Sequence, residues 1–180
     1  MVKLFQGGGF KRTIVSGDVS PQTINKVITL ETARGLGGDA PTQIVVGNTI
    51  ALRFGNNDEA FFSFRIPTDY ASGDLSIFIS PFPTGSETGK SARFQLAYQT
   101  RSPGDFISGT TGTLDSGDVA LPSTQYQVSL VTFAIPEADV VGKIFVSAKV
   151  KRIATIGGND PISNPAITAN TLHYTAYQVV

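Results

Sequence analysis

His173 is the single histidine of this 180-residue chain and the side chain with the widest choice of chemistry. An imidazole can act as a general base, bind a metal or serve in a Ser-His-Asp triad. Zinc, however, needs several His or Cys ligands, and the chain has no cysteine. No Gly-x-Ser-x-Gly elbow precedes His173, which stands between Leu172 and Tyr174 in a strand-like run. We therefore expect it to be an ordinary strand residue.

Carboxylates are the second group with possible chemistry, because two facing carboxyl groups can cleave a glycosidic bond. No two of them share a predicted strand face at i, i+2 spacing, and aspartate in loops favours turns through bonds to the backbone. Residues 115–118 offer oxygen ligands of the kind calcium takes, but without the spacing of an EF-hand loop. We expect no catalytic residue, no metal and no cofactor, so the chain is predicted not to be an enzyme. Nearly all of the acids considered stand at predicted strand ends or in loops: Asp58, Glu59, Asp69, Asp74, Asp105, Asp115 and Asp118.

The overall charge narrows the choice of partners. Fourteen basic and fourteen acidic residues give a formal net charge of zero, which argues against nucleic-acid binding and suits a protein packed into an assembly. A small basic cluster, Lys149, Lys151 and Arg152, is a candidate, together with Arg93, for docking on an acidic surface; alternation places the two lysines toward solvent.

No targeting segment or membrane span is expected. No run approaches the length of about 18 apolar residues that a membrane helix needs. Residues 1–5 are followed by Gln6 and three glycines, which leaves no apolar core for a signal peptide. The absence of cysteine suits synthesis in a reducing cytoplasm.

Period-two alternation, typical of strands with one buried face, dominates the sequence after residue 47. In residues 93–99, Phe94, Leu96 and Tyr98 face one way while the polar side chains face the other. Eight strands are predicted, at about 49–55, 60–66, 74–80, 92–100, 111–115, 125–135, 142–156 and 169–179.

The fold class predicted from these strands is all-β. Strands of unequal length with Gly- and Pro-containing connections and no βαβ rhythm indicate two packed antiparallel sheets. A jelly roll fits the pattern best and an immunoglobulin-like sandwich second.

The first 46 residues differ from the rest, because glycine or proline interrupts them every few residues. We predict an extended N-terminal arm over residues 1–46 and a β-sandwich domain over 47–180. The arm either drapes along its own sheet or reaches onto a neighbour. The arm residues predicted to be buried at an interface are Phe5, Phe10, Ile14, Val15, Val27, Ile28 and Leu30.

Several segments together resemble a known class of proteins over residues 48–180. An aromatic-polar strand runs into a Pro-x-Asp-Tyr turn at residues 61–70, and alternating strands follow at 74–79 and 92–98. Residues 132–136 and 142–153 complete the order. This order is similar to that of jelly-roll auxiliary virion proteins of tailed bacteriophages, the capsid decoration, cement or head-fibre class.

The resemblance implies a structural role in the virion. It implies a homo-oligomer, with a trimer favoured, that attaches to the major capsid protein or another virion protein, often through an N-terminal segment. The alternative is a carbohydrate- or receptor-binding module of a phage tail or cell-surface protein. Phe78 and Phe145, outward by alternation, would stack on sugars or meet another sheet or subunit.

Overall fold

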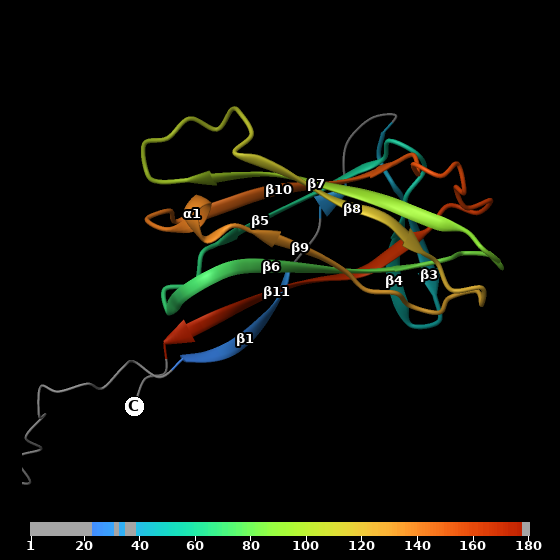
Figure 1. Ribbon diagram of the computed structural model, residues 1–180, viewed down its shortest axis with the longest axis horizontal. Coiled ribbons are helices and arrows are strands. Elements are labelled where there is room, and N and C mark those ends of the chain that lie inside the picture. Colours follow the sequence, from blue (N-terminus) through green and yellow to red (C-terminus); the bar gives the residue numbers. More distant parts are fainter. Residues whose placement is uncertain (1–22, 31–32, 35–38, 178–180) are drawn as a thin grey trace, which may run out of the picture.

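The computed structural model describes residues 23–30, 33–34 and 39–177. Within these ranges, eleven strands form two antiparallel sheets that pack face to face (Figure 1). The first sheet holds β3 (Thr42–Val46), β4 (Thr49–Arg53), β11 (Ala166–Tyr177), β6 (Tyr70–Phe82) and β9 (Val131–Ile135) in that order, with β1 (Thr23–Leu30) also on β11. The second sheet has the order β2 (Ala33–Arg34), β5 (Glu59–Arg65), β10 (Phe145–Ile153), β7 (Ser91–Arg101) and β8 (Gly112–Ala120).

The strand order is that of a jelly roll. Of the eight strands from β4 onward, the first sheet contains β4, β11, β6 and β9, and the second contains β5, β10, β7 and β8. Both the chain's last strand and its next-to-last lie in the middle of a sheet, which closes the two sheets over one core. The prediction of an all-β antiparallel sandwich, with the jelly roll preferred to the immunoglobulin-like arrangement, is confirmed.

Each of the eight predicted strands corresponds to one of β4 to β11, with different ends. The largest difference is in the predicted strand 125–135, because β9 begins only at Val131. Before it, the backbone N–H groups of Tyr126 and Ser129 donate to the carbonyls of Pro83 (2.9 Å) and Pro81 (2.8 Å). The ring of Tyr126 packs edge-on against Phe82, with the centroids 6.1 Å apart. The segment therefore follows the edge of β6 beyond β9 without forming a regular strand, and its Tyr126 ring lies against Phe82.

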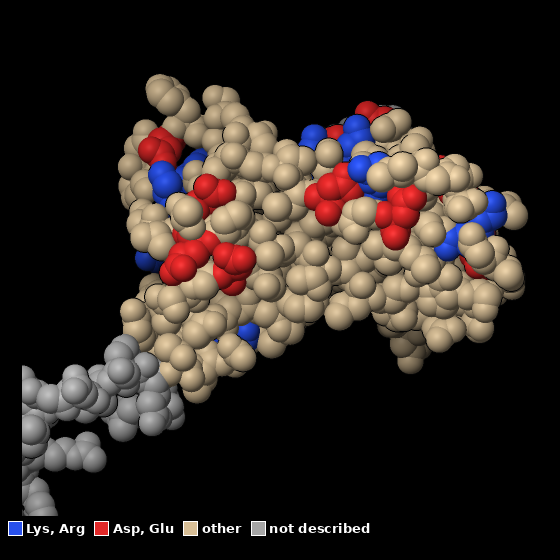
Figure 2. Space-filling model, in the orientation of Figure 1, with Lys and Arg blue, Asp and Glu red and all other residues tan. Residues whose placement is uncertain are grey.

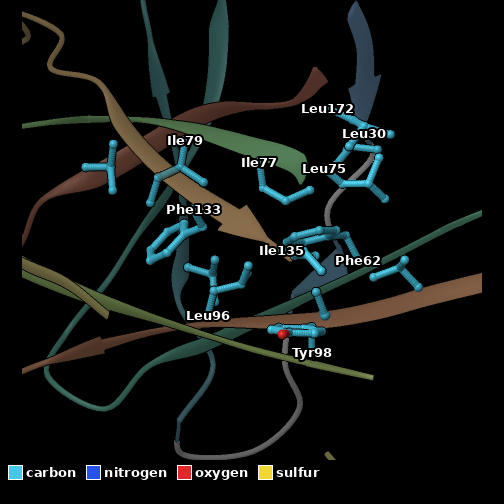
Figure 3. Close-up of a cluster of buried hydrophobic side chains, with 14 of the residues drawn as sticks. Leu30, Phe62, Leu75, Ile77, Ile79, Leu96, Tyr98, Phe133, Ile135 and Leu172 are labelled. Atoms are coloured by element: carbon cyan, nitrogen blue, oxygen red, sulfur yellow. The ribbon is translucent and has the colours of Figure 1, made fainter. Parts of the chain in front are cut away.

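Alternation predicts the core correctly. Leu75, Ile77 and Ile79 of β6 are fully buried, and Leu96 and Tyr98 of β7 lie across the core from them (Figure 3). Phe94 of β7 belongs to the same core, and none of the three β7 side chains is more than 3% exposed. Burial of each such side chain contributes roughly 1.5–3 kcal/mol. Pro67 and Pro136 follow β5 and β9 closely, where a residue without an N–H group ends the pairing.

Part of the predicted arm is paired in the first sheet. β1 lies antiparallel to β11 from Thr23 opposite Tyr177 to Leu30 opposite Asn170, and β3 forms a hairpin with β4. Gly47, with φ of 57°, supplies the left-handed backbone of that hairpin turn. Of the two alternatives for the arm, residues 23–30 and 42–46 therefore follow the first and lie along the sheet of their own chain. Residues 1–22 lie outside the described ranges.

The one helix of the described residues is α1 (Glu137–Val140), a single turn between β9 and β10. Over those residues, accordingly, no helix is long and apolar enough to cross a membrane.

Candidate interaction surfaces

The edge strand β1 places two of the predicted interface residues at the surface. Val27 is 56% exposed on the outer face of the first sheet, and Ile28 is 41% exposed on the side toward the second sheet. Ile24, also on that side, is 40% exposed. Among the described residues no strand pairs with the other edge of β1. The unpaired backbone groups of such an edge can form hydrogen bonds with a strand of another chain.

Leu30 and the more N-terminal predicted interface residues lie elsewhere. Leu30 is only 7% exposed and belongs to the core of its own chain. Its side chain therefore packs within the sandwich at the end of β1. Four of the residues named from the sequence, Phe5, Phe10, Ile14 and Val15, lie outside the described residues.

A polar triad fixes β1 against the neighbouring strands. The ammonium group of Lys26 pairs with the carboxylate of Asp69, and the hydroxyl of Tyr174 donates to the same carboxylate over 3.0 Å. The hydrogen bond from Lys26, together with that from Tyr174, outweighs partial burial and holds the pKa of Asp69 below its ordinary value. The position of β1 is thus set by a specific contact as well as by its ladder.

Phe78 and His173 contact each other on the outer face of the first sheet. Their ring centroids are 4.0 Å apart at an interplanar angle of 43°. Nε2 of His173 also lies 3.1 Å from the hydroxyl of Thr171. Phe78 thus faces outward, as its position in the alternation predicts, with its ring half-buried against the histidine.

Asp115 and Asp118, expected at a strand end or in a loop, lie inside β8 and have separate partners. Asp115 accepts two hydrogen bonds from the Arg93 guanidinium, over 2.9 and 2.6 Å. Asp118 instead accepts the backbone N–H groups of Ile156 and Gly157, over 3.0 and 3.1 Å. Over the described part of the chain, no three His, Cys, Asp or Glu side chains gather as a metal site would require.

The prediction that Arg152 forms a surface cluster with Lys149 and Lys151 is wrong. The side chain of Arg152 is buried, with the residue 3% exposed. One guanidinium nitrogen donates to the carbonyl of Phe54 (3.1 Å) and to Asn164 (2.9 Å), and the other meets Asp160 at 3.3 Å. Arg152 lies two residues after the buried Val150 in β10, and this spacing was the signal in the sequence that its side chain faces inward. Arg152 therefore cannot dock on a partner.

The outer face of the second sheet carries a groove. Three cross-strand rows run over β5, β10 and β7: Phe61, Lys149 and Ala97; then Ser63, Ser147 and Gln99; then Arg65, Phe145 and Arg101. A hollow of about 270 Å³ lies over the first two rows. Small side chains form its floor, Phe61 stands on one side, and Gly109 and Thr110 of the β7–β8 loop stand on the other.

The loop that borders this groove is tied to the sheet. The side-chain nitrogen of Gln99 donates to the carbonyls of Ser108 (2.9 Å) and Phe106 (3.3 Å). Phe145, predicted as an interface residue, is 45% exposed on this face, and Phe61 is 42% exposed. Phe61 was not among the interface residues predicted from the sequence, although its alternation with Phe62 in β5 indicated that one of the two rings faces outward. The exposure of Phe61 depends on the side chains that the fold brings beside it, with Lys149 opposite it on β10, and pattern alone does not give these neighbours.

A cavity of about 400 Å³ lies between the sheets where β1 and β4 meet the same edge of β11. β4 pairs with Ala166 and Ile167, and β1 begins to pair at Asn170. Thr168 and Ala169, in a bulge of β11, therefore line an opening. Leu30, Phe54 and Val150 give its walls an apolar character.

No family model and no curated protein matches this sequence. Among solved structures, the chain is similar to the xylan-binding module CBM15, with 14% identity, a TM-score of 0.49 and coverage of 83% of this chain and 97% of the module. It is also similar to CBM29_1, a family 29 carbohydrate-binding module from Piromyces equi, with 14% identity, a TM-score of 0.40 and coverage of 86% and 91%.

A viral protein is also among the similar structures. The VP2 subviral particle of infectious bursal disease virus is 14% identical, with a TM-score of 0.43; the match covers 94% of this chain but only 37% of the VP2 chain. The identities are too low to carry a function from any of these proteins to this chain.

Proposed function

We propose that this chain is a structural protein of a virion, a capsid decoration or cement protein that forms homo-oligomers and attaches to the capsid surface. The resemblance of its strand and turn segments to phage auxiliary proteins supports this role, as does its zero net charge. The observation that carries the proposal is the open edge of β1, with exposed apolar side chains on both of its faces.

Assembly would proceed by strand addition at this edge. A neighbouring strand takes up the backbone groups of β1, while its side chains cover Val27 on one face and Ile28 on the other. Each large apolar side chain that is fully buried contributes roughly 1.5–3 kcal/mol before the cost of ordering the segments. In the view of Figure 2, charged side chains gather at the left and at the upper right of the molecule, and few lie over its lower middle part.

The partners of the proposed role are other copies of the chain, in a trimer, and the major capsid protein or another virion protein. Residues 1–22 directly precede β1, the strand of the proposed contact, in the sequence. Phe5, Phe10, Ile14 and Val15 remain predicted contacts with a neighbour.

Mass measurement in solution tests the proposal with three proteins. The full chain is expected to be oligomeric, and both Val27→Lys and a chain beginning at Thr23 are expected to shift toward monomer. Truncation at Thr23 retains β1 and buried Leu30, which a start at residue 47 would remove. Val128→Lys, at a residue 55% exposed in the loop before β9, is the matched control. A monomeric full chain, or an unchanged mass for Val27→Lys, contradicts assembly through β1.

A second candidate function is a module that binds carbohydrate or a receptor. The groove of the second sheet favours it, because Phe61 offers an exposed ring beside hydroxyl and amide groups. Aromatic faces stack on the apolar faces of sugars, and polar side chains bond to their hydroxyls. Binding of the full chain to a glycan array, lost in Phe61→Ala, is the expected result; an array with no binder contradicts it.

A further inference from the structure

We propose that the outer face of the second sheet binds an acidic oligosaccharide, a chain of uronic acid units, along the groove between Phe61 and the β7–β8 loop. The inference rests on the second candidate function and is independent of assembly, because β1 lies in the other sheet. The cationic groups, the polar floor and the aromatic rings of this face each support it.

The net positive charge of this face favours an anionic ligand. Arg65 and Arg101 flank Phe145 on adjacent strands, and within the described residues neither makes an ion pair. Lys149 and Lys151 share a single carboxylate, that of Glu59, at 2.9 and 3.6 Å. Positive charge on this face therefore exceeds what its own carboxylates neutralise.

Arg101 is placed to receive a carboxylate. One of its terminal nitrogens donates to the hydroxyl of Ser147, which directs the guanidinium over the sheet. Its Nε is buried and closed to a ligand, so over the described residues the other terminal nitrogen is the donor that a ligand can reach. A hydrogen bond from a charged guanidinium to a carboxylate is stronger than one between neutral groups, and the carboxylate is its natural partner. The uronate carboxyl group supplies that partner.

The floor of the groove suits the hydroxyl groups of a sugar. The hydroxyls of Ser63 and Ser147 lie 3.2 Å apart in one row with Gln99. Because the nitrogen of the Gln99 amide is used by the loop, its oxygen is left as an acceptor for a ligand hydroxyl. Ala97, paired with Lys149, leaves room above the sheet.

The spacing of the aromatic rings favours an extended ligand. Phe61 is paired with Lys149, four residues along β10 from Phe145, which corresponds to about 13 Å along the strand. Several sugar units in a row can contact both rings. An acidic protein partner is less suited to the face, because protein interfaces place bulky apolar side chains at their centre, and here the centre is small and polar.

Calorimetric titration of the full chain with an oligogalacturonate tests the inference. We expect binding that weakens as salt is raised. Arg65→Gln and Arg101→Gln are each expected to lower the affinity by about tenfold, a loss of one charged contact. Arg53→Gln, at an exposed arginine of β4 in the first sheet, is the matched control and should bind as the unchanged chain does. Circular dichroism confirms that each variant is folded.

Three outcomes overturn the inference in different ways. Equal affinity for a neutral oligogalactan of the same length removes the acidic requirement but leaves the carbohydrate-binding module standing. Equal affinity for poly-glutamate assigns the face to an acidic protein surface instead. No binding of any of these, or equal losses in Arg53→Gln and Arg65→Gln, removes the inference, while the glycan array reports separately on the second candidate function and the oligomer mass on assembly.

Discussion

The hydroxyl of Tyr98 donates a hydrogen bond to the carboxylate of Asp139 over 2.5 Å. Tyr98 belongs to β7 in the second sheet, and Asp139 to the single turn of α1 that leads from β9 into β10. The bond therefore ties the crossover between the sheets to the core side of β7. Burial, and then the neighbouring carboxylate, raise the pKa of Tyr98 to about 12.

Replacing Tyr98 with phenylalanine should lower the free energy of unfolding by about 1–2 kcal/mol, because a hydrogen bond to a charged group is lost. This difference should depend on pH. The pKa of Tyr98 is higher in the folded protein than the ordinary 10.0, so the folded state holds the proton more tightly. The contribution is complete below pH 10 and is lost as the pH rises from 10 toward 12.

Urea unfolding of the unchanged chain and of Tyr98→Phe across this pH range measures the effect. Tyr126→Phe, at a residue 47% exposed, is the control and should stay within about 0.5 kcal/mol of the unchanged chain. If the free energies of unfolding of Tyr98→Phe and the unchanged chain differ by the same amount up to pH 12, the hydrogen bond is not the source of the stability.

Gly112, at the start of β8, leaves the space that the Tyr98 ring occupies. A Cβ atom added at Gly112 would lie 2.6 Å from Cζ of Tyr98 and would also overlap its hydroxyl oxygen. Gly112→Ala should therefore cost about 1–3 kcal/mol through overpacking, as thermal unfolding would show. Because the clash is with the ring itself, Tyr98→Ala in the same chain should remove most of the added cost. Additive losses would contradict this explanation.

Local pattern accounts for the strands and the core, but not for the contacts between distant segments. Phe94 and Leu96 were predictable as buried because alternation is a property of one strand. Arg152 was counted as a surface residue, since its partners Phe54, Asp160 and Asn164 come together only through the fold. β1 was missed as a strand of the sheet because Lys26 interrupts its apolar face, and the partner of that lysine, Asp69, lies 43 residues away.

Leu30 and Ile28 point to the same side of β1 but differ in what covers them. Leu30 lies in the core, whereas Ile28 is 41% exposed. Leu30→Ala should lower the free energy of unfolding by about 2–4 kcal/mol, and Ile28→Ala by less than about 1 kcal/mol. Urea unfolding at low protein concentration separates this effect from assembly. Equal losses for the two variants would show that the end of β1 does not pack as described.

Glu87 is a buried carboxylate in the loop between β6 and β7, with the residue 1% exposed. It accepts hydrogen bonds from the backbone N–H groups of Ile162 (3.0 Å) and Ser163 (2.6 Å) and from the Ser163 hydroxyl (2.7 Å). Burial alone would raise its pKa, but these hydrogen bonds outweigh burial and hold the pKa below the ordinary 4.5. The ionised carboxylate thus joins this loop to the segment before β11.

Glu87→Gln should lower the free energy of unfolding at pH 7 by about 1–3 kcal/mol, because an amide nitrogen cannot accept the N–H groups that the carboxylate receives. The folded pKa of Glu87 is depressed, so its contribution is present above the ordinary value of 4.5 and is lost as the pH falls through the folded pKa. Urea unfolding between pH 7 and pH 2 should therefore show the two proteins converging under acid. Glu137→Gln, at an exposed residue of α1, is the control and should follow the unchanged chain throughout. If the Glu87→Gln deficit persists at pH 2, the loss reflects packing in this loop and not the charge.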